Sequence, residues 1–180
     1  MHLVMDHTLV ERVKTAIRDI PDFPQPGIVF KDITPILSDG PLFNAVIQHL
    51  AGQYAGQGIE AVVGIESRGF IFGSAVADRL GAGFAPVRKP GKLPSTTMRA
   101  SYDLEYGSDA LEIHDDAVKA GQRVLIVDDL LATGGTAKAA SELVQRLGGD
   151  VHALAFLIEL VGLNGRDKLA DHRLHTVLKY

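Results

Sequence analysis

The sequence has no cysteine and no tryptophan, and aromatic residues make up only 6% of its 180 positions. Without cysteine there can be no disulfide, no thiolate nucleophile and no cysteine-ligated metal. No apolar run approaches the ~18 residues that a membrane-spanning helix needs, so no membrane partner is expected. The first residues, MHLVMDHTLVER, lack the basic start and apolar block of a secretory signal. These absences are compatible with the cytoplasm, where we expect the protein to act.

Excess positive charge is also absent, because the formal net charge is −4. A nucleic-acid-binding protein usually carries a basic footprint, so no nucleic-acid partner is expected. An anionic ligand would have to be bound by a few local cations and by backbone N–H groups. The hydrophobic share of 46% is enough for a substantial core, and the length suits one domain.

Short apolar runs without alternation recur along the second two thirds of the chain. They occupy residues 61–65 (AVVGI), 84–88 (FAPVR), 123–127 (RVLIV) and 151–160 (VHALAFLIEL). Helical segments are expected between them, at residues 69–80 and 135–147. This order predicts an α/β fold with a mainly parallel central sheet flanked by helices.

Two further helices are expected in the N-terminal part. Thr8 and Glu11 fit a capping box, followed at helical spacing by Val10, Val13 and Ile17. The proline-rich residues 21–27 end this helix and predict an irregular segment. The second helix is expected to begin at Asp39-Gly40-Pro41, and its buried stripe to comprise Phe43, Val46, Ile47 and Leu50.

Residues 98–114 break the α/β rhythm. Apolar and polar residues alternate in SYDLEYG and in ALEIH, with residues 107–109 between them. This pattern predicts an antiparallel hairpin added to the core. The preceding residues 89–97 (KPGKLPSTT) are expected to form a mobile basic loop.

The most informative motif is VLIVDDLLATGGT at residues 124–136. A buried strand runs directly into Asp128 and Asp129, at the sheet edge where ligands of α/β proteins bind. Ribose hydroxyls or a hydrated cation would suit these two carboxylates. The following Ala132, Thr133, Gly134, Gly135 and Thr136 offer hydroxyls and N–H groups at a helix start for a phosphate. The alternative is an acidic turn and a simple helix cap; a Walker A loop is excluded because no lysine follows these glycines in the G-x-x-x-x-G-K pattern.

A second candidate anion site follows the strand at residues 61–65. Glu66, Ser67 and Arg68 precede a helix there, and an arginine can bind a diphosphate with two hydrogen bonds. Arg88, Lys89 and Lys92 in the basic loop could add positive charge. The alternatives are a surface arginine at a helix start and an ordinary solvated loop.

The residue 124–136 motif resembles the signature of the type I phosphoribosyltransferases. The segments PDFPQPGIVFKDITPIL, GIESRGFIFG, VRKPGKLP and SYDLEYG narrow the resemblance to the adenine phosphoribosyltransferases, over nearly all of residues 17–160. The resemblance implies one phosphoribosyltransferase domain over residues 1–180. Within it, residues 1–35 would form an N-terminal hood, residues 36–180 the core, and residues 89–114 the flexible loop and hairpin.

The resemblance also implies the reaction and the site. Adenine and 5-phosphoribosyl 1-diphosphate would give AMP and diphosphate, with Mg²⁺ bound mainly through the sugar diphosphate rather than by a protein metal site. Asp128, Asp129 and residues 132–136 would bind ribose and the 5-phosphate, while residues 66–68 and the loop cations would bind diphosphate. A homodimer is expected, with some loop cations reaching across its interface.

The base and proton roles also come from the resemblance. Val29, Phe30 and Lys31 would bind adenine, with the ring of Phe30 packing on the base. Many relatives have arginine in place of Lys31. Glu105 would be the acid-base group, and Tyr102 and Tyr106 would support the loop. Without the resemblance, Phe30 could equally be a core residue and Glu105 an exposed strand glutamate.

Three other functions remain open at this stage. The protein could be a phosphoribosyltransferase for guanine, hypoxanthine, xanthine or orotate. It could be a non-catalytic regulator that senses the sugar diphosphate, although no DNA-binding segment is visible. A diphosphokinase-like synthetase would need an ATP site, which we do not find in the sequence.

Overall fold

The computed structural model describes residues 7–103 and 108–180, and the chain folds as two units, residues 1–49 and residues 50–180. The second unit contains the central sheet and is built from the α/β segments that the sequence predicts. The first contains the N-terminal helices and a small hairpin. None of the helices in the described ranges is both long and apolar enough to cross a membrane.

The second unit is organised around a parallel sheet of five strands in the order β4-β3-β7-β8-β9. The strands are β3 (Ala61–Ile65), β4 (Gly83–Val87), β7 (Arg123–Leu131), β8 (Asp150–Glu159) and β9 (Leu174–Lys179). The predicted α/β class is therefore confirmed. β7 lies in the middle of the sheet, so its end is flanked by the ends of β3 and β8.

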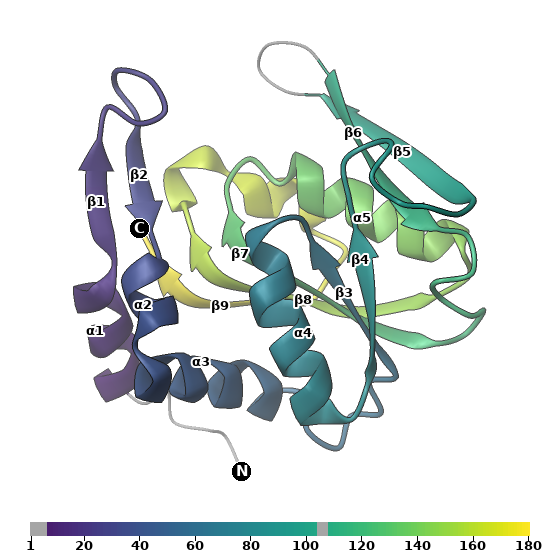
Figure 1. Ribbon diagram of the computed structural model, residues 1–180, viewed down its shortest axis with the longest axis horizontal. Coiled ribbons are helices and arrows are strands. Elements are labelled where there is room, and N and C mark those ends of the chain that lie inside the picture. Colours follow the sequence, from purple (N-terminus) through teal and green to yellow (C-terminus); the bar gives the residue numbers. More distant parts are fainter. Residues whose placement is uncertain (1–6, 104–107) are drawn as a thin grey trace. The chain divides into compact units, whose positions relative to one another are not determined.

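Helix α4 (Arg68–Leu80) covers one face of this sheet and α5 (Gly135–Arg146) covers the other (Figure 1). The two helices lie on opposite faces because both crossovers are right-handed, whereas the units β3-α4-β4 and β7-α5-β8 proceed in opposite directions along the sheet. On the α5 side, strand residues such as Ile126 and Phe156 form a core cluster with Leu143 and Val144. Both helices begin within four residues of a strand end, which places their N-termini at one edge of the sheet.

β7 and β9 differ from the prediction. The apolar pattern indicated a strand over residues 123–127, but β7 continues through Asp128 and Asp129 to Leu131 because β8 pairs with it as far as Glu159. β9 was not predicted. It follows two short 3₁₀ helices, η1 (Val161–Leu163) and η2 (Gly165–Leu169).

The predicted hairpin is present as β5 (Thr97–Asp103) and β6 (Ser108–His114), paired antiparallel. It lies beside α5, where Arg146 donates a hydrogen bond of 2.7 Å to the carbonyl of Arg99. The prediction that residues 107–109 separate the strands was wrong for its last two residues. Ser108 and Asp109 belong to β6, opposite Asp103 and Tyr102.

The first unit contains α1 (His7–Ala16), β1 (Arg18–Pro21), β2 (Val29–Asp32), α2 (Thr34–Ser38) and the start of α3 (Gly40–Gly52). β1 and β2 pair antiparallel on either side of the expected irregular segment. That hairpin and α2 were not predicted. The start of α3 was, and Asp39 caps it by accepting a 3.0 Å hydrogen bond from the N–H of Leu42.

The buried stripes of α1 and α3 differ from the prediction only at their first position. Leu9 rather than Val10 is buried in α1, and Leu42 rather than Phe43 is buried in α3. In both helices the later apolar positions, such as Val13 and Val46, are buried as expected. Helical spacing identifies a face, but at a helix start two neighbouring apolar residues can satisfy it equally well.

Candidate functional site

Three segments with predicted site residues meet at one edge of the sheet in the second unit. β3, β4 and β7 are parallel neighbours, with Ile65 opposite Val87 and Gly64 opposite Val127. Their carboxyl ends lead into residues 66–68, 88–92 and 128–136. Ligands of open α/β sheets bind at this edge.

Asp128 and Asp129 occupy the end of the central strand β7. Asp129 is 5% exposed, and its backbone N–H donates a 2.8 Å hydrogen bond to Oδ1 of Asp128. A Cβ atom on Gly69 would lie only 2.7 Å from the same Asp128 oxygen, so glycine at position 69 leaves room for this carboxylate. Burial and the adjacent Asp129 carboxylate raise the pKa of Asp128 well above its usual range.

Arg68 links this acidic pair to the first turn of α4. Its Nε donates a hydrogen bond of 2.5 Å to Oδ2 of Asp129, across 61 residues of sequence. The Arg68 side chain is 35% exposed, whereas the Asp129 side chain is 7% exposed. In this pair the arginine is therefore partly exposed to solvent, while the carboxylate at the end of β7 is buried.

Glu66 gathers the basic residues that follow β4. Its carboxylate accepts hydrogen bonds from Nε of Arg88 at 3.0 Å, from the backbone N–H of Lys89 at 3.0 Å and from Nζ of Lys92 at 2.7 Å. Burial alone would raise the pKa of Glu66, but these hydrogen bonds outweigh burial and lower the pKa. The loop cations are therefore held near the end of β3 by a carboxylate.

The side chain of Lys89 has a separate partner on the β5–β6 hairpin. Its Nζ forms an ion pair with Asp109 and lies 3.3 Å from the hydroxyl of Tyr102. Tyr102 also donates a hydrogen bond of 3.2 Å to Asp109. No local sequence signal marks Asp109, because this contact depends on how the hairpin folds back toward β4.

The segment Ala132–Thr136, called the phosphate loop below, connects β7 to α5. Gly134 has a left-handed φ of 79° at the N-cap of α5, a conformation that favours glycine. A cavity of about 80 Å³ is lined mainly by this loop and by the end of β7. Backbone N–H groups at the start of a helix suit an anion.

A further contact to the phosphate loop was missed by the sequence reasoning. The backbone of Gly165, at the start of η2, packs directly on that of Ala132 and Gly134. Nothing in the local sequence indicates this approach, since 29 positions separate Gly165 from the motif's last residue.

The predicted adenine-binding residues belong to the first unit. Val29, Phe30 and Lys31 form most of β2, and Val29 is 50% exposed. The ring of Phe30 meets that of Phe23 edge to face, with centroids 5.1 Å apart. Lys31 Nζ is paired with Asp19 at 2.7 Å, which directs its side chain to the neighbouring strand. Phe23 extends the apolar surface of this hairpin and was not among the predicted site residues.

The predicted acid-base residue Glu105 lies outside the described residues, as does Tyr106. The described residues also contain no group of three His, Asp or Glu side chains placed to hold a metal ion. Asp128 and Asp129 nevertheless offer the oxygen ligands that Mg²⁺ prefers, and Mg²⁺ is often held by one or two carboxylates together with substrate phosphates.

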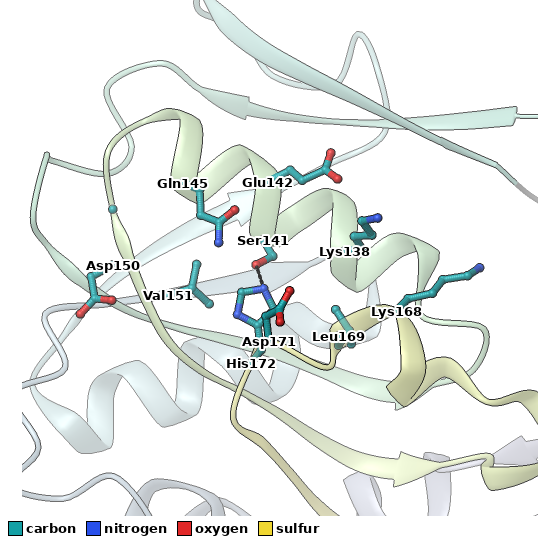
Figure 2. Close-up of a pocket in the computed structure, with 11 residues that line it drawn as sticks. Lys138, Ser141, Glu142, Gln145, Asp150, Val151, Lys168, Leu169, Asp171 and His172 are labelled. Carbon is teal, nitrogen blue, oxygen red and sulfur yellow. Dashed lines mark hydrogen bonds between the residues drawn. The ribbon is translucent and has the colours of Figure 1, made fainter.

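A larger cavity, of about 440 Å³, lies between α5 and the end of η2 with the residues that follow it (Figure 2). Its side chains carry mixed charge, including Lys138, Lys168, Glu142 and Asp171. Ser141 and His172 form a 2.8 Å hydrogen bond at its inner wall. None of the predicted site residues lines it, so the larger volume does not mark the candidate site.

Comparison with known proteins identifies the family of this fold and site. Residues 35–173 match the phosphoribosyl transferase domain. The adenine phosphoribosyltransferase of Acidobacterium capsulatum is 55% identical over 170 residues, covering 94% of each chain. The crystal structure of adenine phosphoribosyltransferase from Thermoanaerobacter pseudethanolicus has 54% identity and a TM-score of 0.93, covering 95% of this chain and 99% of its own.

A third similar protein was solved with ligands. The adenine phosphoribosyltransferase of Saccharomyces cerevisiae, in complex with D-2,5-dideoxy-2,5-imino-altritol 1,6-bisphosphate and adenine, has 44% identity and a TM-score of 0.90. The alignment covers 95% of this chain and 99% of the yeast chain. The similarity thus extends over both units.

Proposed function

The chain belongs to the adenine phosphoribosyltransferase family, and we propose how its residues divide the work of the reaction. The enzyme transfers the 5-phosphoribosyl group from 5-phosphoribosyl 1-diphosphate to adenine and forms AMP and diphosphate, a step of purine salvage. The observation that best supports this division is the meeting of an acidic pair, a cationic cluster and a glycine-rich loop at adjoining strand ends.

In this proposal the sugar is held from the β7 side. Asp128 and Asp129 accept hydrogen bonds from the ribose hydroxyls, and residues 132–136 bind the 5-phosphate through N–H groups and threonine hydroxyls. Fixing the sugar at two places leaves its anomeric carbon in line between adenine and the leaving diphosphate. Positioning of this kind can provide much of the rate without a protein nucleophile.

The leaving diphosphate is assigned to the β3 and β4 ends, with the Glu66-Ser67 backbone alongside. Arg68, Arg88, Lys89 and Lys92 would stabilise the negative charge that develops as the glycosidic carbon–oxygen bond breaks. Mg²⁺ bound mainly through the diphosphate oxygens would add to this stabilisation. Because Glu66 and Asp129 hold three of these cations, diphosphate must displace or share those contacts.

Adenine is assigned to Val29, Phe30 and Lys31. The partly exposed, apolar end of the β1–β2 hairpin supports this role, since a purine ring gains from contact with an aromatic side chain. The pairing of Lys31 with Asp19 suits recognition through its backbone rather than its side chain. Glu105 remains the proposed group for the proton that leaves adenine as its nitrogen attacks the sugar.

We also propose a homodimer that acts in the cytoplasm. Exposed apolar side chains on α4 and on β4 support self-association: Ile71 is 40% exposed and Phe84 is 38% exposed. Light scattering should give about twice the chain mass of 19.3 kDa; a mass equal to one chain would contradict the dimer.

A base-specificity assay tests the proposed function. Diphosphate release is measured with Mg²⁺, the sugar diphosphate and each of adenine, guanine, hypoxanthine, xanthine and orotate. We expect rapid release only with adenine. Faster release with another base would change the assigned substrate, and tight sugar-diphosphate binding without turnover of any base would support the sensor alternative.

A further inference from the structure

We propose that residues 164–172, called the backing segment, set the shape of the phosphate loop, and that Gly165 is the positioning residue through which they do so. The inference rests on the assignment of the phosphate loop to the 5-phosphate under the proposed function. It adds a part of the chain that the phosphoribosyltransferase motif does not contain.

Gly165 meets Ala132 and Gly134 of the phosphate loop through backbone atoms. A Cβ atom on Gly165 would lie 2.1 Å from the carbonyl oxygen of Ala132 and 2.9 Å from the nitrogen of Gly134. In the other direction, a Cβ atom on Gly134 would lie 2.3 Å from the carbonyl oxygen of Gly165. Neither position can accept a side chain unless one of the two backbones moves.

This contact bears on the groups that would bind phosphate. Gly134 is the N-cap of α5, and its carbonyl accepts a 3.0 Å hydrogen bond from the N–H of Lys138. The directions of the N–H groups in residues 132–136 follow from the backbone path on either side of Gly134. Because the Gly165 backbone packs against Ala132 and Gly134, it restricts this backbone path and therefore the directions of the N–H groups.

One end of the backing segment is anchored to β8 by an ion pair. Arg166 donates two hydrogen bonds to Glu159, from Nε at 2.9 Å and from Nη2 at 2.6 Å. Glu159 is 5% exposed and also accepts a 3.0 Å hydrogen bond from the hydroxyl of Thr176. These hydrogen bonds, led by those from Arg166, lower the pKa of Glu159 although burial alone would raise it.

The same glutamate lies beside the phosphate loop in the sheet. Glu159 is opposite Leu131, the last residue of β7 before the loop, and the N–H of Leu160 donates a 2.9 Å hydrogen bond to the Leu131 carbonyl. The anchor of the backing segment and the start of the phosphate loop are therefore adjacent on paired strands. A paired, two-bond arginine contact fixes orientation as well as distance.

The other end of the backing segment is anchored to α5. Leu169 is 1% exposed and belongs to the core cluster that includes Leu143. Ser141, in the middle of α5, makes the 2.8 Å hydrogen bond to Nε2 of His172 that Figure 2 shows. Because both ends are attached, Gly165 can resist displacement of the loop rather than follow it.

Gly165→Ala and Gly162→Ala form a matched pair of variants for the test. Neither glycine has a left-handed φ, so alanine adds no backbone strain at either position. A Cβ atom on Gly162 would meet nothing within 4 Å, whereas one on Gly165 would collide with the phosphate loop. The pair therefore isolates the contact from the general effect of replacing a glycine in this region.

Binding of ribose 5-phosphate is measured by calorimetry, together with the KM for each substrate and the thermal midpoint. Gly165→Ala should weaken ribose 5-phosphate binding and raise the KM for the sugar diphosphate by about tenfold or more, because a displacement near 1 Å can have such an effect. The KM for adenine should stay within about twofold of the wild-type value, as a local change predicts. Gly162→Ala should resemble the wild type.

Arg166→Lys provides a second variant that does not add a side chain to the contact. Lysine keeps a positive charge beside Glu159 but cannot make the two parallel hydrogen bonds. It should weaken ribose 5-phosphate binding in the same direction as Gly165→Ala, by a smaller factor, and it decides the question if Gly165→Ala fails to fold.

Unchanged ribose 5-phosphate binding in a folded Gly165→Ala protein, or in Arg166→Lys if the first variant does not fold, would overturn the inference. An equal loss in Gly162→Ala would also overturn it. Failure of the proposed function would look different, because wild-type protein would then not bind ribose 5-phosphate or not release diphosphate with adenine.

Discussion

The two regions of the second unit that we propose to bind anions are built in different ways. At the ends of β3 and β4, cationic side chains converge and are already paired with carboxylates of the same chain, with Arg88 and Lys92 on Glu66 and Arg68 on Asp129. At the end of β7, the phosphate loop is shaped by close backbone packing between Gly134 and Gly165. The first region is defined by charge and the second by backbone packing.

This difference indicates different binding behaviour. In the region assigned to diphosphate, a ligand would compete with Glu66 and Asp129, so binding would exchange one set of ion pairs for another. In the region assigned to the 5-phosphate, backbone packing would hold the N–H groups in place before a ligand binds, so the entropic cost of ordering the loop would be met during folding. Such a division suits an enzyme that keeps the sugar in place while diphosphate leaves.

The largest expected effect comes from the carboxylates between the two regions. Replacing Asp128 and Asp129 together with asparagine keeps the shape but removes both charges. Two charge-assisted hydrogen bonds to the ribose would be weakened, which predicts a fall in kcat/KM of about a thousandfold. Steady-state kinetics with the sugar diphosphate at fixed adenine measures this, and wild-type kinetics would remove the pair from the site.

Gly134→Ala tests the region that is defined by backbone packing. The new Cβ atom would lie 2.3 Å from the Gly165 carbonyl, and alanine would also be strained at the φ of 79°. We expect the KM for the sugar diphosphate to rise by about tenfold or more, from a strain of about 1–3 kcal/mol that shifts the loop.

Gly121→Ala is the control for that strain. Gly121 has a similar φ of 75°, but a Cβ atom there would meet nothing within 4 Å. It should lower the free energy of unfolding by about 1–2 kcal/mol without changing the KM. If both variants change the KM equally, the packing argument fails.

Asp128→Asn alone separates stability from activity at the acidic pair. Because burial and then Asp129 raise the folded-state pKa of Asp128 above the unfolded value of 3.8, the folded state binds this proton more tightly. The wild type therefore loses stability as pH rises from 3.8 through the folded-state pKa. At pH 7 the variant should be more stable by about 1 kcal/mol and less active.

Urea unfolding at pH 3 and at pH 7 measures this difference. The stability gain should appear at pH 7 and shrink toward pH 3, where the wild-type carboxyl is protonated in both states. A variant that is less stable than the wild type at pH 7 would contradict the account of Asp128.

The smallest expected effect comes from Glu66→Gln on the diphosphate side. Loss of this charge weakens the internal ion pairs of Arg88 and Lys92, so inorganic diphosphate should bind about two- to fivefold more tightly. The pKa of Glu66 is lowered in the folded state, so its stabilising effect is present above the unfolded value of 4.5 and lost as pH falls through the folded-state pKa. Calorimetry with diphosphate measures the affinity, and weaker binding would contradict competition by Glu66.

Four strands of the central sheet, β3, β4, β7 and β8, could be predicted because their signal is local. Buried parallel strands such as those at 61–65 and 123–127 have continuous apolar runs, and helices follow them at short intervals. The placement of Asp128, Asp129 and the phosphate loop at a strand end could be predicted for the same reason. β1 and β2 were not predicted, because the proline-rich residues 21–27 interrupt this segment before an alternation of apolar and polar residues can be recognised.

The contacts that organise the site could not be predicted. Arg68 meets Asp129 across 61 positions, and Lys89 meets Asp109 across 20, because strands distant in sequence become neighbours in the sheet or hairpin. In the sequence, Gly165 is indistinguishable from an ordinary loop glycine, because its contact with the phosphate loop forms only when β7 and β8 pair. Glu105 lies outside the described residues, so its role stays a prediction.

The salt dependence of wild-type binding tests the contrast between the two regions most directly. Calorimetry with inorganic diphosphate and with ribose 5-phosphate is performed at low salt and at high salt. Because partly exposed cations are screened by salt whereas a packed backbone loop keeps its geometry, diphosphate affinity should fall much more steeply than ribose 5-phosphate affinity. Equal salt dependence of the two ligands would contradict the division into a charge-defined and a packing-defined half.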